Sequence, residues 1–139
     1  MYNKTYKLFL YGSLRKGMPL NYMLRSVQNK GEKGLTKELF SLYSIGDRYP
    51  CLVKSPNERV VGEVVEVDEK TYNYISEMEK SAGYHTEEII VIVRGQEVVV
   101  ECYMMTEDKA KMRIDGLVNG GDWVPYFNEK DKERQLQYN

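Results

Sequence analysis

This chain of 139 residues has no excess of charge of either sign, because its 20 basic residues are balanced by 21 acidic ones. A formal net charge of −1 gives no basic field for nucleic acid and no polybasic patch for an anionic membrane. No apolar run approaches the length that spans a bilayer. The first seven residues lack the apolar segment and cleavage site of a signal peptide. We therefore expect a cytoplasmic protein with neither a nucleic acid nor a membrane as its partner.

Metal ligands and disulfide-forming residues are also scarce. The chain has one histidine, His85, and two cysteines, and it contains no Cys-x-x-Cys motif. This composition argues against a metal site of ordinary ligand type. Cys51 and Cys102 each lie in an apolar, strand-like segment, which favours buried free thiols over a disulfide.

What the chain does have is the composition of an ordinary globular domain, with 42% hydrophobic and 29% charged residues. Its length predicts one domain, placed at residues 1–127, followed by a charged C-terminal tail at residues 128–139. Twelve tyrosines are the one unusual feature. They suit either a small, partly polar cavity or simply a sequence rich in strands, and the second explanation carries more weight.

Hydrophobic patterning predicts many strands and few helices. The expected strands cover residues 7–11, 35–45, 51–53, 60–67, 87–93 and 97–104, the last two joined as a hairpin at 94–96. Helices are expected at 20–27 and at 69–79, the latter with Asp68 as its N-cap. Residues 55–58 are predicted to form a turn, and residues 115–126 a glycine-rich loop anchored by Trp123. This order predicts an α+β fold whose mixed sheet curls into a small β-barrel flanked by short helices.

The apolar run at residues 8–10 ends in Tyr11-Gly12-Ser13-Leu14, the most informative turn of the chain. Glycine and serine tolerate tight turns, so a strand that ends there can leave several main-chain N–H groups unpaired and facing one way. Such a concavity suits an anion or a developing oxyanion. Alone, the turn is a weak signal.

The second signal is a carboxylate on the apolar face of the helix expected at 69–79. On a helical wheel with Tyr72 at the origin, Ile75 falls near 300° and Glu79 near 340°, whereas Glu77 projects near 140°. Partial burial and the negative end of the helix dipole both raise the pKa of a carboxyl at this position. A carboxyl with a raised pKa is suited to general acid/base work. The alternative is a surface glutamate at a frayed helix end.

Together these features resemble the gamma-glutamylcyclotransferase-like (AIG2-like) family over residues 6–126. The matching segments are Tyr11-Gly12-Ser13-Leu14, Val61-Gly62-Glu63-Val64, Ile75-Ser76-Glu77-Met78-Glu79, Tyr84, Gly121-Asp122-Trp123 and Tyr126. The resemblance implies a compact barrel of mixed strands with a cavity that opens at the Tyr-Gly-Ser-Leu loop.

The resemblance also implies an enzyme that releases 5-oxoproline and an amine from a γ-glutamyl substrate, without a cofactor or metal. It places the catalytic glutamate at Glu79 and the substrate-binding loop at Tyr11, Gly12, Ser13 and Leu14. Two positions depart from the family pattern. Lys80 stands where glycine often follows the glutamate, and Thr86 stands where many relatives carry arginine. Both departures bear on the substrate rather than on the fold.

Three further residues are candidates for substrate contact. Arg15 is as suited to meeting a substrate carboxylate as to being a flanking surface charge. Tyr84 and Tyr126 are equally suited to lining the cavity or to packing. The leaving group stays open among an amino acid, an isopeptide-linked lysine and a protected metabolite, and the oligomeric state is not readable from the sequence.

Two other functions are weighed against an enzyme. The first is a non-catalytic module of the same fold that binds a small anion. The second, more distant, is an interaction protein that uses exposed tyrosines and the charged tail.

Overall fold

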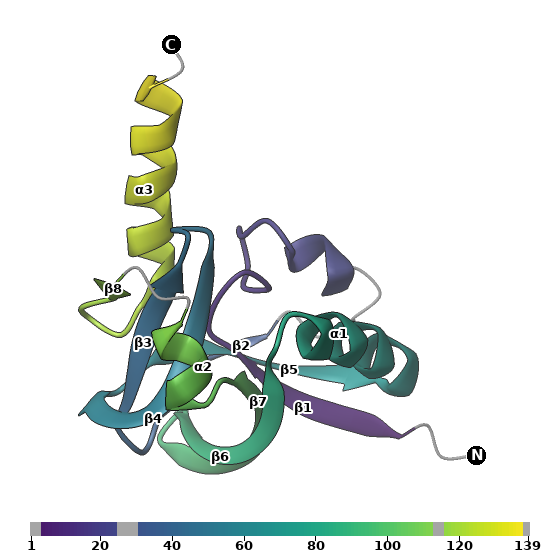
Figure 1. Cartoon of the computed structure of the whole chain (residues 1–139). Coiled ribbons are helices and arrows are strands. Elements are labelled where there is room, and N and C mark those ends of the chain that lie inside the picture. The colour runs from purple at the N-terminus through teal and green to yellow at the C-terminus, as the bar shows by residue number, and fades with distance from the viewer. Residues whose placement is uncertain (1–3, 25–30, 113–115, 138–139) are drawn as a thin grey trace.

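A computed structural model describes residues 4–24, 31–112 and 116–137 of the chain. Figure 1 shows a body of curved strands with one helix, α1, beside it and a second, α3, projecting from it. The elements run in the order β1 Thr5–Leu10, η1 Asn21–Leu24 (a 3₁₀ helix), β2 Glu32–Thr36, β3 Phe40–Ile45, β4 Tyr49–Glu58, β5 Val61–Asp68, α1 Glu69–Ser81, β6 His85–Val93, β7 Gln96–Met104, α2 Glu107–Lys111, β8 Gly116–Leu117 and α3 Trp123–Gln137.

Five strands close into a barrel in the order β1-β5-β2-β6-β7. Four of the pairings are antiparallel, and the barrel closes through a parallel contact between β1 and β7 at Leu8 and Glu101. The long β6–β7 hairpin turns at Arg94 and Gly95, both at positive φ, as a two-residue turn requires. The predicted α+β class with a mixed barrel and short flanking helices is therefore confirmed.

A close backbone approach at Gly62 fixes the pairing of β5 with β1. A Cβ atom at this position would overlap the carbonyl oxygen of Leu10 and the ring of Phe9. Only glycine leaves room for the phenylalanine ring inside the barrel, which explains the glycine in an otherwise apolar strand. Phe9 is one of the fully buried core residues.

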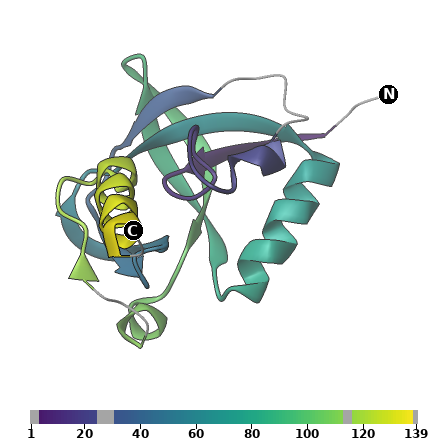
Figure 2. The same ribbon diagram turned by 90° about the horizontal axis from the view of Figure 1, so that it is seen from above.

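Helix α1 begins where the sequence predicts. Asp68 is its N-cap and accepts a hydrogen bond of 2.8 Å from the backbone N–H of Thr71. The helix buries Ile75 against a cluster that includes Leu8, Leu10 and Val67. Seen from above, α1 and α3 lie on opposite sides of the segment that follows β1 (Figure 2). This segment therefore ends up between the two longer helices.

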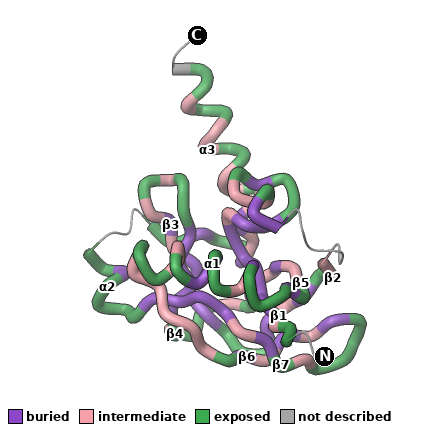
Figure 3. Tube along the Cα trace, turned by 90° about the vertical axis from the view of Figure 1, so that its right-hand side faces the viewer, coloured by how far each residue is buried: buried purple, intermediate pink, exposed green. Residues whose placement is uncertain are grey.

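A second sheet, in the order β4-β3-β8, packs beside the barrel. Trp123, at the start of α3, is fully buried in a cluster with Phe40, Leu42, Leu52 and others, which fits its expected role as an anchor. Between Val124 and Leu136 no residue of α3 is buried, and Figure 3 shows the helix leaving the body of the protein. Within the described residues, no helix is long and apolar enough to cross a membrane.

Several predicted boundaries are wrong. The strand expected at 35–45 is two strands, β2 and β3, and the turn expected at 55–58 lies inside β4. The helix expected at 20–27 is a 3₁₀ helix at Asn21–Leu24, and residues 25–30 lie outside the described part. Trp123 begins helix α3 instead of ending a loop, and this helix crosses the boundary placed between residues 127 and 128. That residues 128–139 form a separable tail stays a prediction.

Candidate functional site

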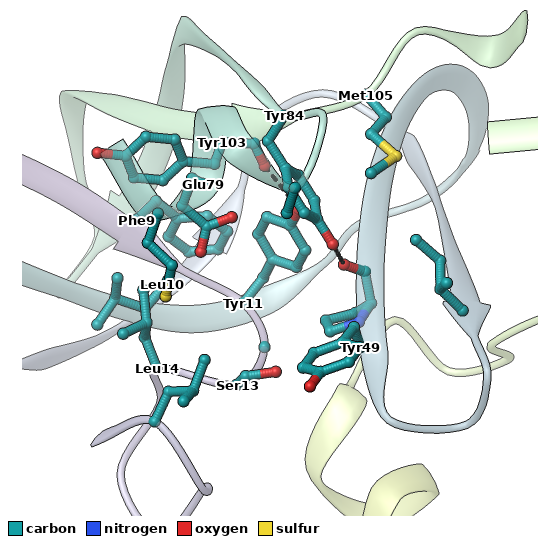
Figure 4. Close-up of a pocket in the computed structure, with 16 residues that line it drawn as sticks. Phe9, Leu10, Tyr11, Ser13, Leu14, Tyr49, Glu79, Tyr84, Tyr103 and Met105 are labelled. Atoms are coloured by element: carbon teal, nitrogen blue, oxygen red, sulfur yellow. Dashed lines mark hydrogen bonds between the residues drawn. The ribbon is translucent and has the colours of Figure 1, made fainter. Parts of the chain in front are cut away.

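A cavity of about 410 Å³ opens between the end of β1, the β3–β4 hairpin and the end of α1. Six of the predicted site residues line it, namely Tyr11, Gly12, Ser13, Leu14, Glu79 and Tyr84. The other lining residues are Phe9, Leu10, Leu20, Ile45, Tyr49, Pro50, Met78, Ala82, Tyr103 and Met105. Figure 4 shows that these side chains converge from segments far apart in the sequence.

Glu79 directs its carboxyl into this cavity from the last turns of α1 (Figure 4). Burial removes water from the carboxyl and raises its pKa from 4.5 to about 7. A carboxyl of this kind is close to half ionised at neutral pH, so it can both accept and return a proton.

The two neighbouring glutamates of α1 differ as the helical wheel predicts. Glu79 is partly buried, whereas Glu77 is exposed to solvent. Ile75, on the same side as Glu79, is fully buried. The placement of Glu79 on the apolar face is therefore confirmed, and Glu77 is a matched solvent-facing carboxylate in the same helix.

The Gly12–Leu14 loop lines the cavity and carries unpaired backbone donors. Its carbonyl oxygens are used internally: Gly12 accepts from the N–H of Arg15 at 3.0 Å, Ser13 from Leu20 at 2.9 Å and Leu14 from the side-chain amide of Asn21 at 2.9 Å. By contrast, the N–H groups of Gly12, Ser13 and Leu14 donate to no acceptor in the described residues. Unpaired N–H groups grouped in this way suit a negatively charged oxygen.

Glycine at position 12 allows the loop to touch the opposite wall of the cavity. A Cβ atom on Gly12 would overlap the ring of Pro50 at the start of β4. The loop and the β3–β4 hairpin are therefore in direct contact, and a larger residue at position 12 would push them apart.

Tyr11 and Tyr84 line the cavity with their rings, while their hydroxyl groups act as structural links. The Tyr11 hydroxyl donates to the carbonyl of Tyr103 at 2.5 Å and accepts from the N–H of Leu52 at 3.2 Å. The Tyr84 hydroxyl donates to the carbonyl of Pro50 at 2.6 Å. Burial raises the pKa of Tyr11, so its hydroxyl stays neutral and keeps donating.

Arg15 and Tyr126 are not among the residues that line the cavity. Arg15 is buried between two carboxylates, with Nε 2.6 Å from Glu63 and Nη1 2.7 Å from Asp122. Tyr126 donates its hydroxyl to Asp47 and packs against Trp123. Each side chain joins one part of the fold to another in this structure, and contact of either one with substrate stays a prediction.

Sequence reasoning missed Ile45 and Met105, which line the cavity from the end of β3 and from the residue after β7. Ile45 and Tyr49 are paired across the β3–β4 hairpin, and Pro50 and Met105 lie beside them in the cavity. Nothing local marks Ile45 and Met105 as cavity residues, because Met105 reaches this side of the cavity only through its backbone contact with Leu52 of β4. Among the described residues, no cluster of histidine, cysteine or acidic side chains could hold a metal ion. Both cysteines are free and buried, as expected.

The chain matches the family model described as Gamma-glutamyl cyclotransferase, AIG2-like, over residues 8–125. It belongs to this family. A Methanocaldococcus jannaschii protein named as a candidate gamma-glutamylcyclotransferase is 32% identical over 122 residues, which cover 86% of this chain and 96% of the relative. A Pyrococcus horikoshii protein named in the same way is 36% identical over 86 residues, covering 62% of this chain and 70% of the relative.

Solved structures agree with the family assignment. A mouse AIG2-like protein superposes with a TM-score of 0.64 at 25% identity, covering 73% of this chain and 77% of the mouse chain. The two departures from the family pattern, Lys80 and Thr86, do not line the cavity. Lys80 is exposed, and Thr86 is paired with Tyr103 in the β6–β7 hairpin.

Proposed function

We propose that this gamma-glutamylcyclotransferase-like protein releases 5-oxoproline and an amine from a γ-glutamyl substrate, with Glu79 as the general acid and base. The observation that carries the proposal is the Glu79 carboxyl, which shares one cavity with the unpaired N–H groups of Gly12, Ser13 and Leu14. A proton-transfer group and an oxyanion site in one small cavity are the two elements that an acyl-transfer reaction needs.

The reaction begins with the α-amino group of the substrate in its free amine form. Its nitrogen attacks the γ-carbonyl carbon, and a new C–N bond closes the five-membered ring. The ionised Glu79 takes the proton that the attacking nitrogen sheds. The protonated Glu79 then gives this proton to the leaving nitrogen as the original C–N bond breaks. The products are 5-oxoproline and the free amine, so atoms and protons balance.

The carbonyl oxygen carries a negative charge in the tetrahedral intermediate between these steps. The N–H groups of Gly12, Ser13 and Leu14 are the donors proposed to stabilise it. Donors already fixed in place need no reorganisation when the charge develops, which makes this contribution large. The loop is held by its contact with Pro50 and by the ion pairs of Arg15.

The cavity also supplies a second source of acceleration. The attack is intramolecular, so the substrate must be held folded back on itself with its amine near the γ-carbonyl. A cavity lined by the rings of Tyr11, Tyr84 and Tyr103 restricts the substrate in this way.

The test measures 5-oxoproline release from a panel of γ-glutamyl amino acids and amines. Glu79→Gln keeps the size of the side chain but cannot accept the proton, so turnover should fall by about 10²–10⁴-fold. Glu77→Gln, on the exposed side of the same helix, is the matched control and should retain activity. Turnover that survives in Glu79→Gln would contradict the role of Glu79.

A complete absence of 5-oxoproline from every substrate would instead favour a binding module. Thermal-shift measurements on the same panel then separate the cases, because a module that binds 5-oxoproline or a γ-glutamyl compound would be stabilised by it.

A further inference from the structure

Helix α1 is joined to strand β7 by two hydrogen bonds between side chains. The Tyr72 hydroxyl donates to Oε2 of Glu101 at 2.6 Å, and the hydroxyl oxygens of Ser76 and Tyr103 lie 2.5 Å apart. Tyr72 also stacks on Tyr6 of β1, with ring centroids 3.8 Å apart. Neither hydrogen bond takes part in the reaction proposed above, so these polar contacts serve another purpose.

The spacing of the two bonds follows the repeats of the helix and the strand. Tyr72 and Ser76 are four residues apart, so they are neighbours on the surface of α1. Glu101 and Tyr103 are two residues apart and therefore share one face of β7. Glu79 comes three residues after Ser76 and lies within about 60° of it on the helical wheel. Of the two bonds, the one between Ser76 and Tyr103 is therefore the closer to Glu79.

The Ser76–Tyr103 bond is buried, with the two residues only 6% and 4% exposed. A buried hydroxyl is costly unless it is hydrogen-bonded, so the pair resists any movement that would separate its members. An apolar contact tolerates a small slide of one element over another, whereas a hydrogen bond weakens once its distance and angle change. The bond therefore fixes where this part of α1 sits on β7.

The Glu79 carboxyl lies next to the Ser76–Tyr103 bond. Figure 4 shows this carboxyl beside the Tyr103 ring, and both residues line the cavity. The other titratable side chains that line the cavity or face Glu79 come from the segments after β1 and α1, from β4 and from β7: Tyr11, Tyr84, Tyr49 and Cys102.

The surroundings of Glu79 are uncharged near neutral pH. Burial raises the pKa of Tyr11, Cys102 and Tyr103, so these groups stay neutral at pH 7. Glu79 is the only side chain ionised near neutral pH among the described residues that line the cavity. How readily its carboxyl ionises is therefore set by how much water reaches it, and this depends on where α1 sits.

We infer that the Ser76–Tyr103 hydroxyl pair positions the Glu79 carboxyl in the cavity by holding the last turns of α1 against β7. The two hydroxyls act through Glu79, which makes them positioning groups. Their effect on catalysis rests on the proposed function, whereas the placement of the carboxyl is a property of the protein without substrate. On the other side, the backbone carbonyl of Glu79 accepts from the N–H of Tyr84 at 3.0 Å, so the residue is held from both directions.

Removing either hydroxyl tests the inference. Ser76→Ala and Tyr103→Phe each delete one partner of the bond and keep the ring that lines the cavity. We expect kcat for 5-oxoproline release to fall by on the order of tenfold with little change in KM, because a displaced carboxyl serves the reaction poorly. The double variant should lose no more than either single variant, since both remove the same bond. Ser81→Ala removes an exposed hydroxyl of α1 that donates to the carbonyl of Glu77, and this control should keep the wild-type kcat.

A carbon-13 NMR titration of the glutamate carboxyls gives a readout that needs no substrate. The signal lost in Glu79→Gln belongs to Glu79, whose pKa should be about 7 in the wild-type protein. In Ser76→Ala and Tyr103→Phe this pKa should fall toward 4.5 by on the order of one pH unit, because a loosened helix lets water reach the carboxyl. A contact that serves stability alone would lower the unfolding midpoint and leave this titration unchanged.

The inference is wrong if both folded variants keep the wild-type kcat and the wild-type titration of Glu79, or if their effects on kcat simply add. In either case the proposed function stands, because the wild-type protein still releases 5-oxoproline. If the wild-type protein releases none from any γ-glutamyl compound, the proposed function fails, and the titration alone decides whether the pair positions the carboxyl. Thermal unfolding establishes that each variant is folded before it is compared.

Discussion

The hydroxyl of Tyr126 donates a hydrogen bond of 2.5 Å to Oδ1 of Asp47, although the two residues are 79 positions apart. Asp47 lies in the turn between β3 and β4, and its backbone carbonyl also accepts from Arg134 at 3.2 Å. Both contacts come from α3. The C-terminal helix therefore holds the tip of the hairpin whose two strands place Ile45 and Tyr49 at the cavity.

Removing the hydrogen bond between Tyr126 and Asp47 should loosen the β3–β4 hairpin, while the ring of residue 126 stays packed against Trp123. We expect Tyr126→Phe to lower the free energy of unfolding by about 1 kcal/mol and to raise KM more than it lowers kcat. Denaturant unfolding and steady-state kinetics measure the two effects. Tyr74→Phe, at an exposed position of α1, is the control and should change neither. A Tyr126→Phe protein with wild-type stability and KM would show that the link does not hold the hairpin.

A larger loss of stability is expected from Tyr11→Phe. The hydroxyl of Tyr11 is the partner of two buried backbone groups, the carbonyl of Tyr103 and the N–H of Leu52. Leaving such groups unpaired costs about 1–3 kcal/mol, so the denaturant midpoint should fall while the slope stays constant. Tyr22→Phe, which alters a 59% exposed tyrosine, is the matched control. An unchanged midpoint would mean that water replaces the hydroxyl.

The raised pKa of Glu79 predicts how stability depends on pH. The folded chain holds the proton of this carboxyl up to about pH 7, whereas an ordinary glutamate loses it near 4.5. The stability that depends on the neutral carboxyl is therefore fully present below pH 4.5, and it is lost as pH rises through 7. Glu79→Gln should be more stable than wild type at pH 8 by about 1–2 kcal/mol, allowing for the remaining solvent contact, and equally stable at pH 4.

Activity should depend on the same ionisation of Glu79, but it should rise with pH where stability falls. Because the base must be ionised to take the first proton, kcat/KM should rise as pH increases through about 7. A profile that stays flat down to pH 4 would rule out a carboxyl with a raised pKa as the base.

Arg15 should act on the loop through its two ion pairs. Lysine has a single ammonium group and cannot reproduce the geometry in which Nε meets Glu63 and Nη1 meets Asp122. We expect Arg15→Lys to lower the free energy of unfolding by about 1–3 kcal/mol. A double-mutant cycle with Glu63→Gln should reveal coupling between the two residues. A large rise in KM with unchanged stability and no coupling would instead assign Arg15 to substrate binding.

Local signals were sufficient for part of the fold and of the site. Asp68 and the apolar spacing of Tyr72 and Ile75 predicted α1 and the face that carries Glu79, because capping and amphipathicity act within a few residues. Gly12 and Ser13, just after β1, predicted the tight turn of the Gly12–Leu14 loop for the same reason. The resemblance to the family rested on these two segments together with the shorter matches at residues 61–64, 84, 121–123 and 126.

Turn-forming residues were misleading where a strand is irregular. Ser55, Pro56 and Asn57 lie in β4 at a register shift, where Phe40 pairs with Glu58 and Ser41 with Val53. Proline is tolerated there because β4 is an edge strand of its sheet. The start of α3 did carry a signal: the Asp122 side chain accepts from the N–H of Val124 at 3.2 Å, and Pro125 lies in the first turn.

The links of Arg15 and Tyr126 had no such signal. Each of these two side chains depends on partners between 48 and 107 residues away in the chain. Periodicity and capping describe only near neighbours, so contacts of this kind follow from the closed barrel and not from any single segment.

The parallel contact of Leu8 with Glu101 also has a kinetic consequence. Closing the barrel joins residues 93 positions apart, and contacts of such long range form slowly because a large loop must be ordered first. The cavity draws on β1, the β3–β4 hairpin, α1 and the end of β7, so it exists only after this closure. A bound ligand would therefore stabilise the complete barrel over every partly assembled state, and ligand affinity during refolding would report the last step of assembly.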